Sequence, residues 1–177
     1  GLSWDRMRDA IRIVQTAGTR VRLSCVLLNG EIDSLERIRE YLDFARTLGV
    51  DNVIFRQLMK TDPLTHSVNH VVKYSDQKRT ELTPILEQIS AHSEFHFQRQ
   101  VMGYYYYVEV WKYAGMDVVF EEADLAHLEA EKRRDPALIH ELIFHPNAKL
   151  CSTWQPWDGI LGPAALAQET TRTVSAL

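Results

Sequence analysis

Apolar and polar positions divide the first part of the chain into alternating helix-like and strand-like segments. From Ser3 to Gly18, apolar residues recur at spacings of three and four, which predicts an amphipathic helix with Ser3 at its N-cap. Residues 21–28 are almost continuously apolar around Cys25, a pattern typical of a strand buried on both faces of a parallel sheet. We therefore expect a helix followed by a buried strand.

The alternation continues for one further pair of elements. Asp33 followed by Glu36 has the form of a capping box, and the apolar positions up to Leu48 predict a helix that Gly49 ends. Residues 52–58 (NVIFRQL) predict a second short strand. A strand, a helix and a strand joined by short loops are typical of a right-handed βαβ unit in a parallel sheet.

The middle of the chain is less regular. Residues 60–74 are polar and contain a proline, which predicts an excursion between regular elements. Residues 75–92 have a helical pattern that Pro84 interrupts. Either one helix kinks at Pro84, or Thr83 caps a second helix that has the proline at its first position.

Beyond residue 93 the pattern changes to short strand-like runs separated by glycine-containing turns. It predicts an antiparallel meander of strands at 95–100, 104–113 and 116–121. A charged helix and a last hairpin follow, at 123–133 and within 139–152. The chain is thus expected to have an α/β half at 1–92 and an antiparallel β-rich half at 93–177.

Composition and charge narrow the class of protein. The chain has 177 residues with 45% apolar content, which suffices for a hydrophobic core, and its net charge of −4 argues against nucleic acid as a partner. No apolar run approaches the roughly 18 residues of a membrane span, and the first residues do not resemble a signal peptide. Two isolated cysteines make no disulfide framework, so we expect a cytoplasmic protein that does not contact membranes.

The segments RVRLSCVLLNG, EYLDFARTLGVD and NVIFRQLM occur in this order after the first amphipathic helix. Their order, spacing and residue classes over positions 1–59 resemble the second half of the barrel of radical S-adenosylmethionine (radical SAM) enzymes, in the branch related to molybdenum-cofactor biosynthesis. The resemblance implies an α/β fold, in which half of a (β/α) TIM-like barrel is followed by an antiparallel β-rich α+β extension.

The diagnostic cysteines of this family are missing. Its members hold a [4Fe–4S] cluster through three closely spaced cysteine thiolates, whereas this chain has only Cys25 and Cys151. The resemblance therefore implies a C-terminal part of a longer enzyme, inactive alone, which closes the barrel. S-adenosylmethionine, the cluster and a small-molecule or peptide substrate would be bound by the intact enzyme, and no cofactor is expected on this chain alone.

The resemblance also assigns candidate roles to four residues. Ser24 and Asn29, on the strand at 21–28 and at its carboxyl end, would contact S-adenosylmethionine, because barrel active sites form at that end. Arg56 and Gln57, on the next strand, would contact the substrate. The residues alone leave structural alternatives open: a satisfied hydroxyl, a turn residue, and a strand-end guanidinium paired with a carboxylate.

A second hypothesis is a non-catalytic α/β module that binds a ligand or a partner protein. The strand at 21–28 would have an unpaired edge in a half barrel, so a homo-oligomer formed through that edge is expected under either hypothesis.

Other chemical candidates are weaker. His140 and His145 lie five residues apart instead of the four that a helical zinc motif requires, and His66 and His70 lie in a polar loop. Cys25 is expected to be a packed, inert thiol. An acidic group near the meander is expected to be a solvated face; it consists of Glu109, Glu121, Glu122 and Asp124.

Overall fold

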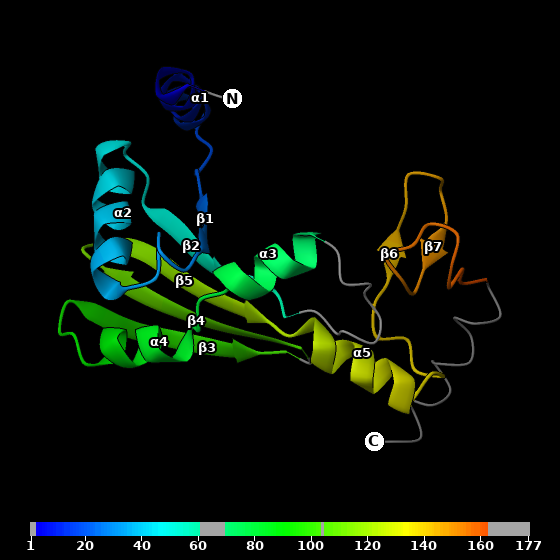
Figure 1. Cartoon of the computed structure of the whole chain (residues 1–177). Coiled ribbons are helices and arrows are strands. Elements are labelled where there is room, and N and C mark those ends of the chain that lie inside the picture. The colour runs from blue at the N-terminus through cyan, green and yellow to red at the C-terminus, as the bar shows by residue number, and fades with distance from the viewer. Residues whose placement is uncertain (1–2, 61–69, 104, 163–177) are drawn as a thin grey trace. The chain divides into compact units, whose positions relative to one another are not determined.

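A computed structural model describes residues 3–60, 70–103 and 105–162 of the chain. The chain divides into two compact units, Gly1–His127 and Leu128–Leu177. The first unit contains a five-stranded sheet with its helices, and the second contains a small hairpin (Figure 1). The described residues thus form a mixed α/β protein.

The first four elements follow the expected order of helix, strand, helix and strand. They are α1 (Trp4–Thr16), β1 (Leu23–Leu27), α2 (Leu35–Thr47) and β2 (Asn52–Gln57). Strands β1 and β2 pair in parallel, which confirms the βαβ unit.

The two N-caps of these helices test the capping predictions. Ser3 caps α1 as expected, since its hydroxyl accepts a hydrogen bond from the Arg6 amide. The N-cap of α2 is Ser34, so the prediction of Asp33 is wrong by one residue. The Asp33 carboxylate instead accepts a hydrogen bond of 2.7 Å from the Gly30 backbone N–H and closes the preceding turn.

Helix α3 (His70–Lys78) begins within residues 60–74, where an excursion was expected, and α4 (Thr83–Ser90) lies in the segment that Pro84 interrupts. The interpretation as a second helix is confirmed, because Pro84 lies in the first turn of α4. Thr83 is the first helical residue and Leu82 is the N-cap, without a side-chain capping bond.

Three antiparallel strands complete the sheet, and they confirm the expected meander. They are β3 (Phe95–Met102), β4 (Tyr106–Tyr113) and β5 (Met116–Ala123). The order across the sheet is β1-β2-β5-β4-β3, and β5 is parallel to β2 (Figure 1). The sheet is open, with β1 and β3 at its edges, and it is not a closed barrel.

The division between residues 92 and 93 does not coincide with a boundary between compact units. The meander shares one sheet with β1 and β2, because β5 pairs with β2 from Asn52↔Asp117 to Arg56↔Glu121. The two compact units divide after His127 instead.

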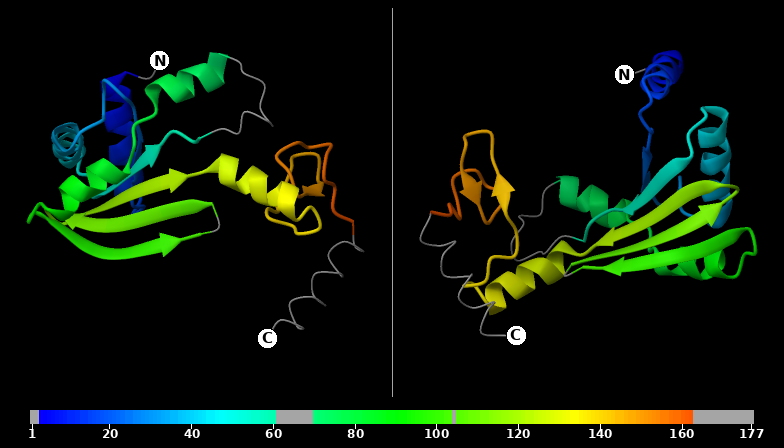
Figure 2. Two further views of the ribbon diagram at one scale, coloured as in Figure 1. Left: turned by 60° about the horizontal axis from the view of Figure 1, so that its bottom comes forward. Right: turned by 180° about the vertical axis from the view of Figure 1, so that it is seen from behind.

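Helices α1, α2 and α4 contribute to a core on one face of the sheet, here called the covered face (Figure 2). Along each strand, side chains of this face alternate with side chains of the opposite face. Those of the covered face include Cys25, Leu27, Val53, Phe55, Trp111, Val118 and Phe120. The opposite face, here called the open face, contributes nothing to that core among the described residues; it comprises Arg22, Ser24, Val26, Asn52, Ile54, Arg56, Arg99, Val101, Val108, Val110, Lys112, Asp117, Val119 and Glu121.

The expectation that β1 is buried on both faces is wrong. Ser24 and Val26 are exposed while Cys25 and Leu27 are buried, because helices cover only one side of this edge strand. An apolar residue in a strand, such as Val26, is therefore not sufficient to predict that its side chain is buried.

The second unit contains an antiparallel pair, β6 (Ile143–Phe144) and β7 (Leu150–Cys151), which confirms the predicted hairpin in shortened form. It follows α5 (Leu125–Arg134), which matches the predicted charged helix. Within this unit, Lys132 Nζ lies 2.7 Å from Glu141 Oε2. None of the helices in the described ranges has the length and apolar character needed to cross a membrane.

Candidate functional site

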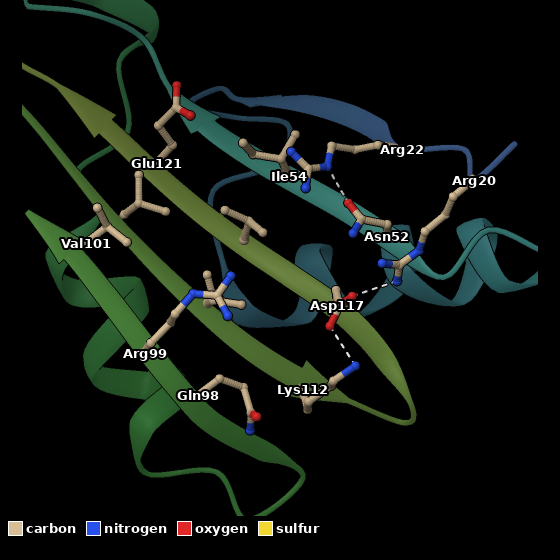
Figure 3. Close-up of a pocket in the computed structure, with 13 residues that line it drawn as sticks. Arg20, Arg22, Asn52, Ile54, Gln98, Arg99, Val101, Lys112, Asp117 and Glu121 are labelled. Carbon is tan, nitrogen blue, oxygen red and sulfur yellow. Dashed lines mark hydrogen bonds and ion pairs between the residues drawn. The ribbon is translucent and has the colours of Figure 1, made fainter.

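A cavity of about 440 Å³ lies on the open face of the sheet (Figure 3). Its floor is apolar and is formed by Ile54, Val101, Val108, Val110 and Val119. Its rim is polar or charged and is formed by Arg20, Arg22, Asn52, Gln98, Arg99, Lys112, Asp117 and Glu121. The alternation of side chains along the strands separates these residues from the core.

An ion-pair network lies at the amino end of β5. Asp117 accepts hydrogen bonds from Lys112 Nζ and from an Arg20 guanidinium nitrogen, each at 2.6 Å. Arg20 Nε also lies 2.9 Å from an Asp51 carboxylate oxygen. Hydrogen bonds from Lys112 and Arg20 lower the pKa of Asp117, and those to Asp51 and Asp117 raise the pKa of Arg20. Asp117 is therefore held as a carboxylate.

The guanidinium of Arg22 has a neutral partner instead. Its Nε donates a hydrogen bond to the side-chain oxygen of Asn52, which is itself buried (Figure 3). This bond fixes the direction of Arg22 without neutralising its charge.

The structure brings two of the four predicted site residues onto the same face. Ser24 on β1 pairs with Ile54 on β2, and Arg56 lies two residues further along β2. The Ser24 side chain is exposed, whereas Arg56 Nε forms an ion pair of 3.3 Å with Glu121 of β5. Both side chains thus belong to the open face.

Gln57 points the other way, onto the covered face, and is only 4% exposed. Its amide nitrogen donates to the Thr80 carbonyl at 2.8 Å, and its amide oxygen accepts from Arg79 at 2.9 Å. Neighbouring strand residues face opposite sides of a sheet, so Arg56 and Gln57 do not line one site. The structure gives Gln57 a supporting role in the core.

Asn29 lies in the loop after the carboxyl end of β1. Its backbone N–H donates to the Lys78 carbonyl at 2.8 Å, and its carbonyl accepts from Lys78 Nζ at 3.0 Å. Gly30 follows with φ of +82°, a left-handed conformation that favours glycine. The backbone of Asn29 therefore ties this loop to the end of α3, and its side chain is exposed.

The acidic group near the meander is divided between the two faces. Glu109 and Glu122 line a second cavity of about 450 Å³ beside α4, whereas Glu121 faces the open side. Glu109 accepts hydrogen bonds from the Tyr107 hydroxyl and, at 2.8 Å, from Trp111 Nε1. Burial of Tyr107 and the hydrogen bond from its hydroxyl to Glu109 raise the pKa of Tyr107 to about 12. Asp124 lines a third cavity together with Glu122, so the four acidic residues do not line one common cavity.

The residues of this chain do not fit an iron–sulfur cluster. Cys25 and Cys151 are both buried and belong to different compact units. Burial raises the pKa of the Cys25 thiol to about 11, as expected for an inert, packed cysteine. Among the described residues, no group of three or more His, Cys, Asp or Glu could hold a metal ion.

The histidine pairs give no metal site either. The segment from His140 to His145 is not a helix, and the buried His145 ring has its Nε2 at 3.1 Å from the Thr153 carbonyl oxygen. His66 lies outside the described residues, and His70 is the first residue of α3.

Sequence reasoning did not select the cations on the rim of the open-face cavity. Arg20 and Arg22 alternate with apolar residues before β1, and this alternation was a readable signal. Lys112 and Arg99 come from β4 and β3, whose place in the same sheet as β2 cannot be read locally. Comparisons with family models, with curated proteins and with solved structures found no match.

Proposed function

We propose that the chain is the C-terminal part of a radical SAM enzyme, which supplies one wall of a barrel and contacts to S-adenosylmethionine and substrate. The carrying observation is the shared placement of Ser24 and Arg56 on the open face, which among the described residues lies outside the hydrophobic core of the covered face. In a (β/α) barrel the inner wall has this character, because helices cover only the outside.

The strand directions support the same proposal. Strands β1, β2 and β5 run parallel, and α2 connects β1 to β2 over the covered face. Strand β1 is an edge, so a preceding parallel strand would have a place to pair. The cluster would then be held by the preceding half of the enzyme, since this chain lacks the three thiolates.

Each site residue would have a distinct role. The exposed Ser24 hydroxyl would hydrogen-bond to S-adenosylmethionine, and the loop at Asn29 would border the ligand at the carboxyl end of β1. Arg56 would contact an anionic group of the substrate after exchanging its Glu121 partner. Gln57 would act through the core, by fixing Arg79 and Thr80.

The first test is the reading frame that precedes residue 1 in the source gene. The proposal expects three closely spaced cysteines there, within the length of half a barrel. A start codon at this point, or a preceding region without such cysteines, would refute it.

The second test measures S-adenosylmethionine binding by the longer protein after anaerobic cluster reconstitution. Ser24→Ala should weaken the affinity about tenfold, as expected for a lost hydrogen bond in a ligand site. Ser90→Ala is the matched control, because Ser90 is an exposed serine on α4 whose hydroxyl donates to the Glu87 carbonyl of the same helix. Equal affinities for both variants would count against the assigned role of Ser24.

The free edge of β1 favours one alternative: a non-catalytic module that self-associates. An unpaired parallel edge is a template for pairing with a second copy. Sedimentation of this chain over a range of concentrations tests it. If the longer protein also dimerises through this edge, no preceding strand pairs with β1, and the module hypothesis replaces the barrel.

A further inference from the structure

We propose that the amino end of the open face binds a small dianionic ligand through phosphate or carboxylate oxygens. The binding groups are the cationic cluster, defined as Arg20, Arg22, Arg99 and Lys112. This inference concerns the end of the face away from Arg56, and it stands whether or not the chain derives from a radical SAM enzyme.

The charge balance of the region is the first argument. The four cations of the cluster are accompanied by two carboxylates within ion-pair distance, Asp51 and Asp117, which leaves an excess of two positive charges. Glu121 does not reduce this excess, since it is paired with Arg56. The protein as a whole carries −4, so the local excess runs against its composition.

Unused hydrogen-bonding capacity is the second argument. Asp117 is shared by Arg20 and Lys112, whereas within the described ranges the Arg22 guanidinium bonds only to the neutral Asn52 amide. The guanidinium of Arg99 lines the cavity and has no ion-pair or hydrogen-bond partner in the part of the chain that the structure describes. A guanidinium offers five N–H donors in a planar fork that matches two oxygens of a phosphate or carboxylate. Two such forks therefore remain available.

The shape of the site is the third argument. On the open face, the Arg22 side chain lies at the β1 edge of the cavity and the Arg99 side chain lies at its β3 edge (Figure 3). The floor between them is apolar, through Ile54, Val110 and Val119. A volume of about 440 Å³ lies within the range of small-molecule sites. The arrangement suits a ligand with an anionic group and a compact apolar or planar body.

Calorimetric titration of the purified protein at low salt and pH 8 tests the proposal with two dianionic probes, inorganic phosphate and succinate. We expect binding that weakens as sodium chloride is added. Arg22→Gln and Arg99→Gln should each weaken it about tenfold. Asp117→Asn should tighten it severalfold, because Lys112 and Arg20 then lose a competing carboxylate. Preference for one probe would identify the ligand as a phosphate or a carboxylate.

Arg12→Gln is the matched control. Arg12 lies on the exposed side of α1 and forms an ion pair with Asp9, so this variant changes the net charge equally without touching the cavity. Circular dichroism verifies that each variant is folded. The proposal is overturned if neither probe binds, if Arg12→Gln weakens binding as much as Arg22→Gln and Arg99→Gln, or if Asp117→Asn weakens it.

Discussion

The covered face and the open face of the sheet draw on alternate residues of the same strands. On the covered face, Phe55 and Phe120 are fully buried and stack with ring centroids 5.4 Å apart. On the open face, the neighbouring Arg56 and Glu121 form an ion pair above an apolar floor. The contrast shows that one strand can contribute to stability with one set of side chains and present chemistry with the other.

The largest contrast is expected for truncation of a large side chain on each face. Phe55→Ala should lower the free energy of unfolding by about 3–5 kcal/mol, because it leaves a cavity in a packed core. Val26→Ala, at a side chain that is 41% exposed, should cost less than about 1 kcal/mol. Chemical denaturation of both variants measures the difference. Similar losses would mean that the open face is packed as tightly as the core.

Thiol alkylation compares adjacent positions of β1. At pH 8, Cys25 should react with iodoacetamide about a hundredfold more slowly than a cysteine introduced by Ser24→Cys, because burial raises the pKa of Cys25 to about 11. Peptide mapping by mass spectrometry separates the two sites. Fast modification of Cys25 in the folded protein would contradict the assignment of faces.

The pair Arg56 and Gln57 sharpens the comparison on β2. Gln57→Ala should lower the free energy of unfolding by about 2 kcal/mol, since the buried Thr80 carbonyl and the partly buried Arg79 guanidinium each lose a hydrogen bond. Arg56→Ala should cost less than about 1 kcal/mol, because this ion pair is half exposed. Thermal unfolding of the two variants measures which substitution lowers stability more. A larger loss for Arg56→Ala would contradict the assignment of Gln57 to the core and of Arg56 to the open face.

The smallest expected effect is the pH dependence that Asp117 contributes. Its pKa is lowered in the folded protein by Lys112 and Arg20, so folding favours the ionised form. This contribution to stability is fully present above the pKa of the unfolded chain, near pH 4, and is lost as pH falls through the folded value. The stability gap between wild type and Asp117→Asn should therefore shrink from about pH 5 toward about pH 2 in acid titrations. A gap that widens on acidification would rule out this linkage.

Local patterns predicted most of the fold because each one reports on a few turns of chain. Hydrophobic periodicity identified the βαβ unit and the meander, and Pro84 marked the first turn of α4, whereas α3 begins at His70 within the expected excursion. The place of β5 beside β2 could not be predicted, since nothing in residues 116–123 specifies a partner so far away in sequence. For the same reason the helix cover on only one side of β1 was missed.

The candidate site was predictable in part. The side chains of Ser24 and Arg56 share a face, as the alternation of side chains allows for neighbouring strands. Grouping Arg56 with Gln57 ignored that same alternation. The cationic cluster combines residues before β1 with residues of β3 and β4, so its existence depends on the order of strands in the sheet.

The parallel pairing of β2 with β5 also bears on the kinetics of folding. The βαβ unit and the meander can each form from contacts that are close in sequence, whereas pairing Asn52 with Asp117 must close a long loop. Where β2 pairs with β5, the stacked rings of Phe55 and Phe120 pack the two parts together. We therefore expect two preformed halves to meet there last, so that the rate of folding is set by a single strand-to-strand junction.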